Sequence, residues 1–216
     1  MTPTFDSLKK LLLFVALVSV WEGIARLGWL PAVVLPAPSA ILERGIALFS
    51  SGEVWPHLIA TSIEVVLGFA LGVGAGFLFG VLVALIPSVE KYVYPYIVAL
   101  QTVPKVAIAP LFLIWFGYGI TSKIVIAGLV CFFPVLVAVM SAFHTTDRDQ
   151  LDMVRAFGAT RWQIFRHLRA YSAMPTIFAG IEIASVFAII GALVGEFVGA
   201  QAGLGYLITA LNFNID

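Results

Sequence analysis

Long apolar runs alternate with short polar segments along this chain. A bilayer core about 30 Å thick requires about 20 mostly apolar helical residues to cross it. Two runs of that length contain no charged residue, and three others contain a few charges or prolines. In chain order the five runs are 10–28, 65–86, 93–116, 124–143 and 173–199. We therefore predict an all-α polytopic membrane protein with a bundle of five transmembrane helices.

The C-terminal sequence stays apolar almost to its last residue. The final residues, GLGYLITALNFNID, are typical of the start of another helix. We therefore expect a sixth transmembrane span, of which the chain contains only the beginning.

Basic residues predict the direction of the chain across the membrane. Cytoplasmic segments of membrane proteins carry an excess of Lys and Arg. With a cytoplasmic N-terminus, eight of these residues lie inside, three lie outside, and Lys105 lies within the membrane. The eight are Lys9, Lys10, Lys91, Arg148, Arg155, Arg161, Arg166 and Arg169, and the three are Arg26, Arg44 and Lys123. We therefore predict that the N-terminus is cytoplasmic.

This orientation divides the chain into three parts. Residues 1–28 form an N-terminal tail and the first span, residues 29–55 form an extracytoplasmic loop, and residues 56–216 form the transmembrane core. The loop contains a short amphipathic helix at 40–50, which Ser39 can cap.

The composition agrees with a membrane protein and excludes several other classes. Hydrophobic residues make up 61% of the chain and charged residues only 11%, whereas a soluble globular protein contains about 25% charged residues. The formal net charge is zero, so the chain has no basic field to attract nucleic acid. A single cysteine, Cys131, excludes a disulfide framework and a cysteine-based zinc site.

Two of the predicted spans carry glycines at four-residue intervals. Residues at this interval share one helical face, where small side chains allow two helix backbones to approach closely. The glycines are Gly68, Gly72, Gly76 and Gly80 in one span and Gly191, Gly195 and Gly199 in the other. We expect both faces to pack in the bundle core, and the alternative is that they line a path through the membrane.

Ionisable residues at membrane depth are costly, so each is a candidate for function. Lys105 follows Pro104 in a segment that three prolines are expected to bend. Lys105 would suit an anionic solute, or it forms a structural ion pair with Glu64 or Glu182, or it extends to the interface. Glu196 is a candidate for gating or for anchoring a loop, whereas Glu64 is near enough to a span end to reach water. The candidate path residues are Lys105, Glu64, Glu182 and Glu196.

The sequence contains no enzyme motif. It lacks G-x-x-x-x-G-K-[ST], so it has no P-loop for ATP. Its histidines, His57, His144 and His167, do not have the spacing of a metal site, and no G-x-S-x-G elbow is present. We predict no catalytic residue, no metal and no cofactor bound by this chain.

Residues 144–172 form the one substantial cytoplasmic segment and predict a helix–Gly–helix element. Apolar residues recur at helical spacing on both sides of Gly158. Asp147 or Asp149 can cap the first helix. Gly158 can end it in a left-handed conformation, after which Thr160 can cap the second helix. Two interpretations are open: the element docks in a groove of another protein, or it lies on the lipid surface.

This segment resembles the so-called EAA loop of binding-protein-dependent ABC transporter permeases, whose pattern begins with E-A-A, three residues and G. Asp152, Met153 and Val154 occupy the E-A-A positions, and Gly158 matches the glycine. Similarity to the nitrate/sulfonate/taurine branch of this family extends in order from residue 35 to 208. It is carried by LPAPSAI at 35–41, PLFLIWFGYGITSKI at 110–124, RAFGATRWQIFRHL at 155–168 and GEFVGAQAGLGYLI at 195–208.

The resemblance implies the permease subunit of an ABC importer in the bacterial inner (plasma) membrane, with a MetI-like fold of six spans. It also implies three kinds of partner: a second permease copy in a homodimer, a cytoplasmic ATPase dimer that binds ATP and Mg, and an extracytoplasmic substrate-binding protein. The coupling residues carried over by position are Asp152, Arg155, Ala156, Phe157, Gly158, Ala159, Thr160 and Arg161.

The transported solute stays open at this point. Members of the branch handle small anions such as nitrate, sulfonates and taurine, whereas relatives with sequences like QTVPKVAIAPLF at 101–112 handle pyrimidine or aromatic compounds. The alternative function is an ion-coupled secondary transporter that uses Glu64, Lys105 and Glu182. The ATP dependence of uptake distinguishes the two functions.

Overall fold

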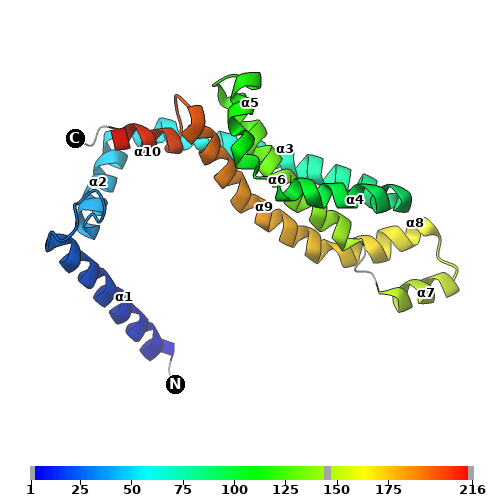
Figure 1. The fold of residues 1–216 in the computed structure, drawn as a ribbon. Coiled ribbons are helices and arrows are strands. Elements are labelled where there is room, and N and C mark those ends of the chain that lie inside the picture. The colour runs from blue at the N-terminus through cyan, green and yellow to red at the C-terminus, as the bar shows by residue number, and fades with distance from the viewer. Residues whose placement is uncertain (1–2, 144–146, 214–216) are drawn as a thin grey trace. The chain divides into compact units, whose positions relative to one another are not determined.

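The computed structural model describes residues 3–143 and 147–213, and in these residues all regular structure is helical. The chain divides into two compact units, Met1–Trp55 and Pro56–Asp216 (Figure 1). Helices α1 (Pro3–Arg26) and α2 (Pro38–Ser51) form the first unit. The second unit contains the remaining helices, which are described in turn below.

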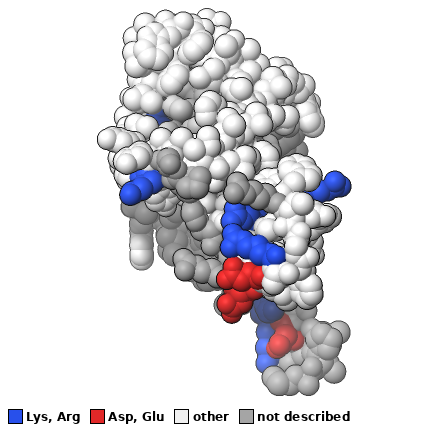
Figure 2. Space-filling view, turned by 90° about the vertical axis from the view of Figure 1, so that its right-hand side faces the viewer, with Lys and Arg blue, Asp and Glu red and all other residues white. Residues whose placement is uncertain are grey.

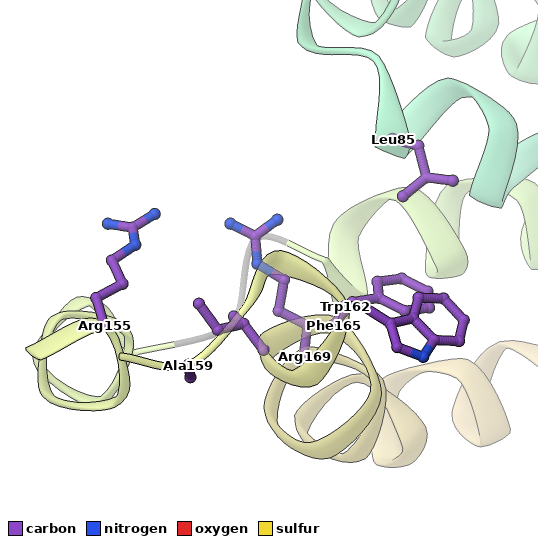
Figure 3. A pocket seen from close by; sticks show the side chains of 7 residues that line it. Leu85, Arg155, Ala159, Trp162, Phe165 and Arg169 are labelled. Carbon is purple, nitrogen blue, oxygen red and sulfur yellow. The ribbon is translucent and has the colours of Figure 1, made fainter. Parts of the chain in front are cut away.

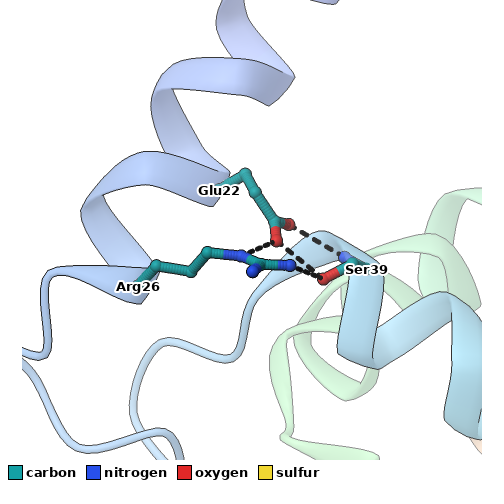
Figure 4. Close-up of polar contacts among 3 residues, drawn as sticks. All are labelled: Glu22, Arg26 and Ser39. Atoms are coloured by element: carbon teal, nitrogen blue, oxygen red, sulfur yellow. Dashed lines mark hydrogen bonds and ion pairs between the residues drawn. The ribbon is translucent and has the colours of Figure 1, made fainter.

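Three polar side chains join the two helices of the first unit (Figure 4). Glu22 of α1 accepts hydrogen bonds from the Ser39 hydroxyl at 2.7 Å and from the Ser39 backbone N–H at 3.0 Å. Arg26 pairs with the same carboxylate. The prediction that Ser39 caps its helix is wrong: Ala37 occupies the cap position without a side-chain hydrogen bond, because Pro38 starts the helix one residue before Ser39. The Glu22 carboxylate instead takes up a free N–H of the first turn.

Two long helices of the second unit pack against a third. α3 (Val54–Leu85) and α9 (Ala170–Gly199) both contact α6 (Ile120–Ala142) through glycine-bearing faces. An added Cβ at Gly72 would lie 2.4 Å from the carbonyl oxygen of Gly128, and one at Gly191 would lie 2.8 Å from the Cα of Ala127. Backbone-to-backbone packing of this kind excludes any larger side chain.

The same close approach recurs along both helices. On α3, a Cβ added at Gly68 would lie 2.5 Å from Ala127. One added at Gly76 would lie 2.6 Å from Phe132, and one added at Gly80 would lie 2.7 Å from Val139. On α9, the distances are 3.1 Å from Lys123 at Gly195 and 2.8 Å from Tyr118 at Gly199. α6 is therefore the central helix of this unit.

Within the described residues, three helices are long and apolar enough to cross a membrane: Val54–Leu85, Ile120–Ala142 and Trp162–Gly199. A fourth crossing is possible where Lys91–Thr102 and Lys105–Phe116 meet at a bend of 77°. This bend confirms the effect predicted for the prolines, because Pro104 lies at the break. The segment consists of α4 (Pro87–Thr102), a short 3-10 helix η1 (Lys105–Ile108) and α5 (Ala109–Phe116).

The remaining helices lie at the two ends of the second unit. α7 (Arg148–Ala156), α8 (Arg161–Ile164) and the π-helical segment η2 (Phe165–Arg169) lead into α9 at one end. α10 (Leu204–Phe213) follows α9 at the other end (Figure 1).

The surface fits a bilayer environment. Many large apolar side chains on the long helices are exposed, including Leu78, Phe79 and Val186. On the face shown in Figure 2, most of the described surface carries no charge. Because such an apolar surface is unfavourable in water, these helices belong in lipid.

Candidate functional site

A cluster of polar side chains is buried in the core of the second unit, at the end where α10 begins. Three of its members come from α3: His57, Thr61 and Glu64. Their spacing of i, i+4 and i+7 places them on one face of that helix. Thr61 is 5% exposed and Glu64 only 3%. The expectation that Glu64 reaches water near the end of its span is therefore wrong.

Glu196 of α9 is the centre of this cluster and is 1% exposed. Its Oε1 accepts a hydrogen bond of 2.6 Å from the Thr61 hydroxyl, and its Oε2 accepts one from the backbone N–H of Gly205. Two neighbouring N–H groups are also satisfied: Leu204 donates to Thr61 Oγ1 at 2.8 Å, and Gly203 donates to His57 Nδ1 at 3.1 Å. Together these side chains take up three backbone donors at the start of α10, which would otherwise be unpaired.

Glycine is required where the chain passes Glu196. Gly203 has φ +118, a conformation that side chains other than glycine rarely adopt. A Cβ at Gly203 would lie 2.2 Å from the Glu196 Cδ, and one at Gly205 would lie 2.9 Å from the Glu196 Cβ. The G-L-G sequence therefore fits around this one carboxylate.

A third charged residue, Lys123 of α6, is buried beside the two carboxylates and is 2% exposed. Its ammonium donates hydrogen bonds to the carbonyl oxygens of Tyr118 and Gly119. Glu64 interacts electrostatically with both Lys123 and Glu196, while Glu64 Oε2 has no hydrogen-bond partner among the described residues. The three charges partly compensate one another in a region from which water is excluded.

The structure does not bring the four candidate path residues together. Glu64 and Glu196 are neighbours, whereas Glu182 lies on an exposed face of α9. Lys105 donates a hydrogen bond of 2.6 Å to the carbonyl oxygen of Gln101 and lies 4.6 Å from the centroid of the Phe133 ring. In the described residues it pairs with neither Glu64 nor Glu182, because its ammonium caps the end of α4 instead.

Sequence reasoning missed three members of the buried cluster. Lys123 was expected in an outer loop, but it belongs to the first turn of α6. His57 and Thr61 were not singled out. The signal for both was their helical spacing from Glu64, since three polar residues on one face of an apolar helix share an environment.

A second candidate site lies at the opposite end of this unit, where α7 and α8 form the predicted helix–Gly–helix element. Asp147 caps α7 by accepting a hydrogen bond of 3.0 Å from the N–H of Asp149. Thr160 and Gln163 form a reciprocal capping box: the N–H of Thr160 donates to Gln163 Oε1 at 2.8 Å, and the N–H of Gln163 donates to Thr160 Oγ1 at 3.3 Å. The predicted helix caps are confirmed.

Gly158 ends α7 in a Schellman motif. Its φ is +79, and its N–H donates to the carbonyl of Arg155 at 2.9 Å. The N–H of Ala159 donates to the carbonyl of Val154 at 3.1 Å. These are the two reverse hydrogen bonds that define the motif, which depends on a left-handed residue.

The candidate coupling residues are mostly exposed. Phe157, the C-cap residue of α7, is 84% exposed and Met153 of α7 is 55% exposed. This end of α7 therefore presents large apolar side chains that the described part of the chain leaves uncovered. Asp152 and Arg155 form a surface ion pair at 3.1 Å. Ala156 and Thr160 are also exposed, Ala159 is half-buried, and the side chain of Arg161 lies outside the described residues.

Stacked rings join this element to the spans. The ring of Phe165 in η2 stacks on Phe143, just after α6, with centroids 5.8 Å apart. The ring of Trp162 in α8 also stacks on Phe165, with centroids 5.7 Å apart. These ring contacts connect α8 and η2 to the end of the central helix α6.

These features define an integral membrane protein with apolar spans, a buried charged cluster and a protruding helical element. The chain belongs to the family described as binding-protein-dependent transport system inner membrane component, whose sequence model matches residues 72–216. The predicted ABC permease family and the all-α membrane fold are confirmed, and the chain is a multi-pass inner-membrane protein of a transport family.

Several relatives are similar over most of their length. The formylaminopyrimidine transport permease protein ThiX of Halalkalibacterium halodurans is 39% identical over 216 residues, which cover 100% of this chain and 86% of that protein. The riboflavin transport system permease protein RibX of Chloroflexus aurantiacus is 37% identical, covering 89% and 72%. The putative aliphatic sulfonates transport permease protein SsuC of Bacillus subtilis is 34% identical, covering 93% and 73%.

Proposed function

We propose that this chain is the permease subunit of an ABC importer and that α7 docks on a partner ATPase. The observation that carries the proposal is the unpartnered apolar surface of α7, where Phe157 is 84% exposed. A short amphipathic helix of this kind is suited to a groove on another protein. ATP and Mg bind to the partner, and this chain has no catalytic residue of its own.

The aromatic contacts supply a route for the coupling. Docking moves α7 and α8 as one element, because the Schellman motif at Gly158 fixes the turn between them. The stack of Trp162, Phe165 and Phe143 then carries this movement to α6. ATP binding shifts the bundle between inward-facing and outward-facing states to the extent that the ATPase contacts differ in the two states.

A variant of the docking helix tests this proposal. We expect Phe157→Ala to abolish co-purification of the ATPase and ATP-dependent uptake in proteoliposomes, since a buried aromatic anchor contributes about 2–4 kcal/mol to an interface. Tyr171→Ala removes an aromatic ring that is 75% exposed from α9 and serves as the matched control. ATPase binding that survives Phe157→Ala unchanged would contradict the docking role.

The other partners follow from the same proposal. A second copy of this chain completes the transport path as a homodimer, and a substrate-binding protein docks on the extracytoplasmic side. The N-terminus and α7 both lie in the cytoplasm, as the distribution of Lys and Arg favours.

For the solute, we favour a pyrimidine or related aromatic compound over a sulfonate. The support is the 39% identity to the formylaminopyrimidine permease across the whole chain, compared with 34% to the sulfonate permease. Competition experiments in cells that express the complete transporter distinguish the two. A formylaminopyrimidine should compete for the binding protein and so inhibit uptake of the transported solute. If only aliphatic sulfonates inhibited this uptake, the assignment would be reversed.

Lys105 is the remaining candidate for the path. It is half-buried at the break between α4 and η1, whereas Glu64 and Glu196 are buried in the core. We propose that Lys105 borders the path while its ammonium stabilises the end of α4. Lys105→Gln should then alter the KM of uptake more than the amount of inserted protein.

A further inference from the structure

A cavity of about 1040 Å³ lies where α7, α8 and η2 meet the end of α3 (Figure 3). It is distinct from the exposed apolar side chains Met153 and Phe157. Its lining residues are Leu85, Arg155, Ala159, Trp162, Ile164, Phe165 and Arg169. The lining therefore combines two guanidinium groups with aromatic and aliphatic side chains.

The cationic part of the cavity has unused hydrogen-bonding capacity. Arg169 Nε is buried and has no hydrogen-bond partner in the part of the chain that the structure describes. A buried guanidinium N–H without an acceptor is uncommon in proteins, because its desolvation is then uncompensated. Arg155 forms a single exposed ion pair with Asp152, and its guanidinium points in the same direction as that of Arg169 (Figure 3). Two forks with this arrangement suit the oxygens of a phosphate group.

The apolar part of the cavity lies beside these charges. Trp162 and Phe165 form a stacked wall. Leu85, the last residue of α3, also lines the cavity and is 53% exposed. A ligand that satisfies both parts has an anionic head and an apolar tail.

The position of the cavity identifies the source of such a ligand. The helix Trp162–Gly199 has 38 residues, whereas about 20 suffice to cross the hydrocarbon core. Because Arg166 and Arg169 lie in its first turns, these are the turns that extend past that core to the level of the lipid headgroups. Tryptophan and arginine are typical of this interfacial region.

We propose that the cavity binds the headgroup of an anionic phospholipid, with its phosphate on Arg169 and Arg155 and an acyl chain along Trp162 and Leu85. Because Arg155 belongs to α7 and Arg169 to η2, one bound phosphate bridges the two sides of Gly158. If α7 docks as proposed above, this lipid reinforces the angle that the Schellman motif at Gly158 gives to α7. The binding itself does not depend on that docking.

Native mass spectrometry of the purified full chain, without any ATPase, tests the proposal. The probes are phosphatidylglycerol and the zwitterionic phosphatidylcholine, titrated into wild-type protein and Arg169→Gln. We expect wild type to prefer phosphatidylglycerol, and Arg169→Gln to weaken its binding about tenfold, as the loss of a charge-assisted hydrogen bond predicts.

Two controls decide the outcome. Arg166→Gln removes the same charge from η2 at a residue that does not line the cavity, and it should leave binding unchanged. Arg155→Gln is a second test variant, which should weaken binding even if Arg169→Gln folds poorly. Equal binding of phosphatidylglycerol by wild type and Arg155→Gln would overturn the proposal, as would an equal loss in Arg166→Gln. If inorganic phosphate bound as tightly as the lipid, this result would also overturn the proposal, because the ligand of the cavity would then be free phosphate rather than a lipid headgroup.

Discussion

Glu196 joins α9, α3 and the start of α10 through a single carboxylate. Each of its oxygens accepts one hydrogen bond, from Thr61 and from Gly205. The sequence singled out Glu196 because a carboxylate in an apolar run is costly. Its partners were harder to predict, since a backbone N–H such as that of Gly205 carries no side-chain signal, and only the folded chain brings together residues 61 and 196.

The first prediction concerns this carboxylate. We expect Glu196→Ala to destabilise the protein by about 1–3 kcal/mol for each buried donor left without an acceptor, and Glu196→Gln to be less damaging because its amide oxygen retains one bond. Thermal unfolding in detergent measures the stability of the two variants relative to wild type. Glu182→Gln changes an exposed carboxylate on the same helix and should be neutral. If Glu182→Gln and Glu196→Gln gave the same loss, the cluster would have no special role in stability.

The second prediction concerns Gly203. Gly203→Ala would place a Cβ 2.2 Å from the Glu196 Cδ and would require a left-handed alanine, which costs about 1–2 kcal/mol before any clash. We expect a larger loss of stability than from Gly119→Ala, where a Cβ meets nothing within 4 Å and φ is negative. Thermal unfolding of the two variants compares them directly, and similar midpoints would show that the loop moves away from Glu196 at little cost.

At the scale of elements, capping and periodicity predicted more than packing did. The helix–Gly–helix element followed from local rules, because a cap, a glycine and a second cap act over a few residues. The glycine intervals predicted close-packed faces, but the sequence does not specify that both faces contact α6. The π-helical segment between α8 and α9 has no signal that we recognise in the sequence.

The third prediction tests the packing of α3 on α6. Gly72→Ala directs a Cβ to within 2.4 Å of the Gly128 carbonyl oxygen, whereas a Cβ at Gly74 meets nothing within 4 Å. Alanine is favoured over glycine within a helix by about 1 kcal/mol. We therefore expect Gly74→Ala to be neutral or stabilising and Gly72→Ala to lower the unfolding midpoint. Equal behaviour of these two variants, two residues apart, would exclude the close approach.

At the scale of the whole molecule, the number of crossings depends on α1. Its 24 residues span about 36 Å, which is long enough to cross a bilayer. However, α1 is not one of the helices that are apolar enough to cross a membrane by composition. It contains the charged residues Lys9, Lys10, Glu22 and Arg26. A helix with charges at both ends and an apolar middle is compatible with crossing when the charged side chains extend to the interfaces.

The fourth prediction determines this topology by cysteine labelling. Cys131 is fully buried, so a Cys131→Ala background removes the one native thiol with little change in volume. In right-side-out membrane vesicles, an impermeant thiol reagent should label Glu53→Cys but neither Ser7→Cys nor Arg166→Cys, since the latter two are predicted to be cytoplasmic. After the membrane is permeabilised, all three should react. Labelling of both Ser7→Cys and Glu53→Cys from outside would show that α1 does not cross. Labelling of Ser7→Cys and Arg166→Cys but not of Glu53→Cys would show that the orientation is reversed and that α7 faces away from any cytoplasmic ATPase.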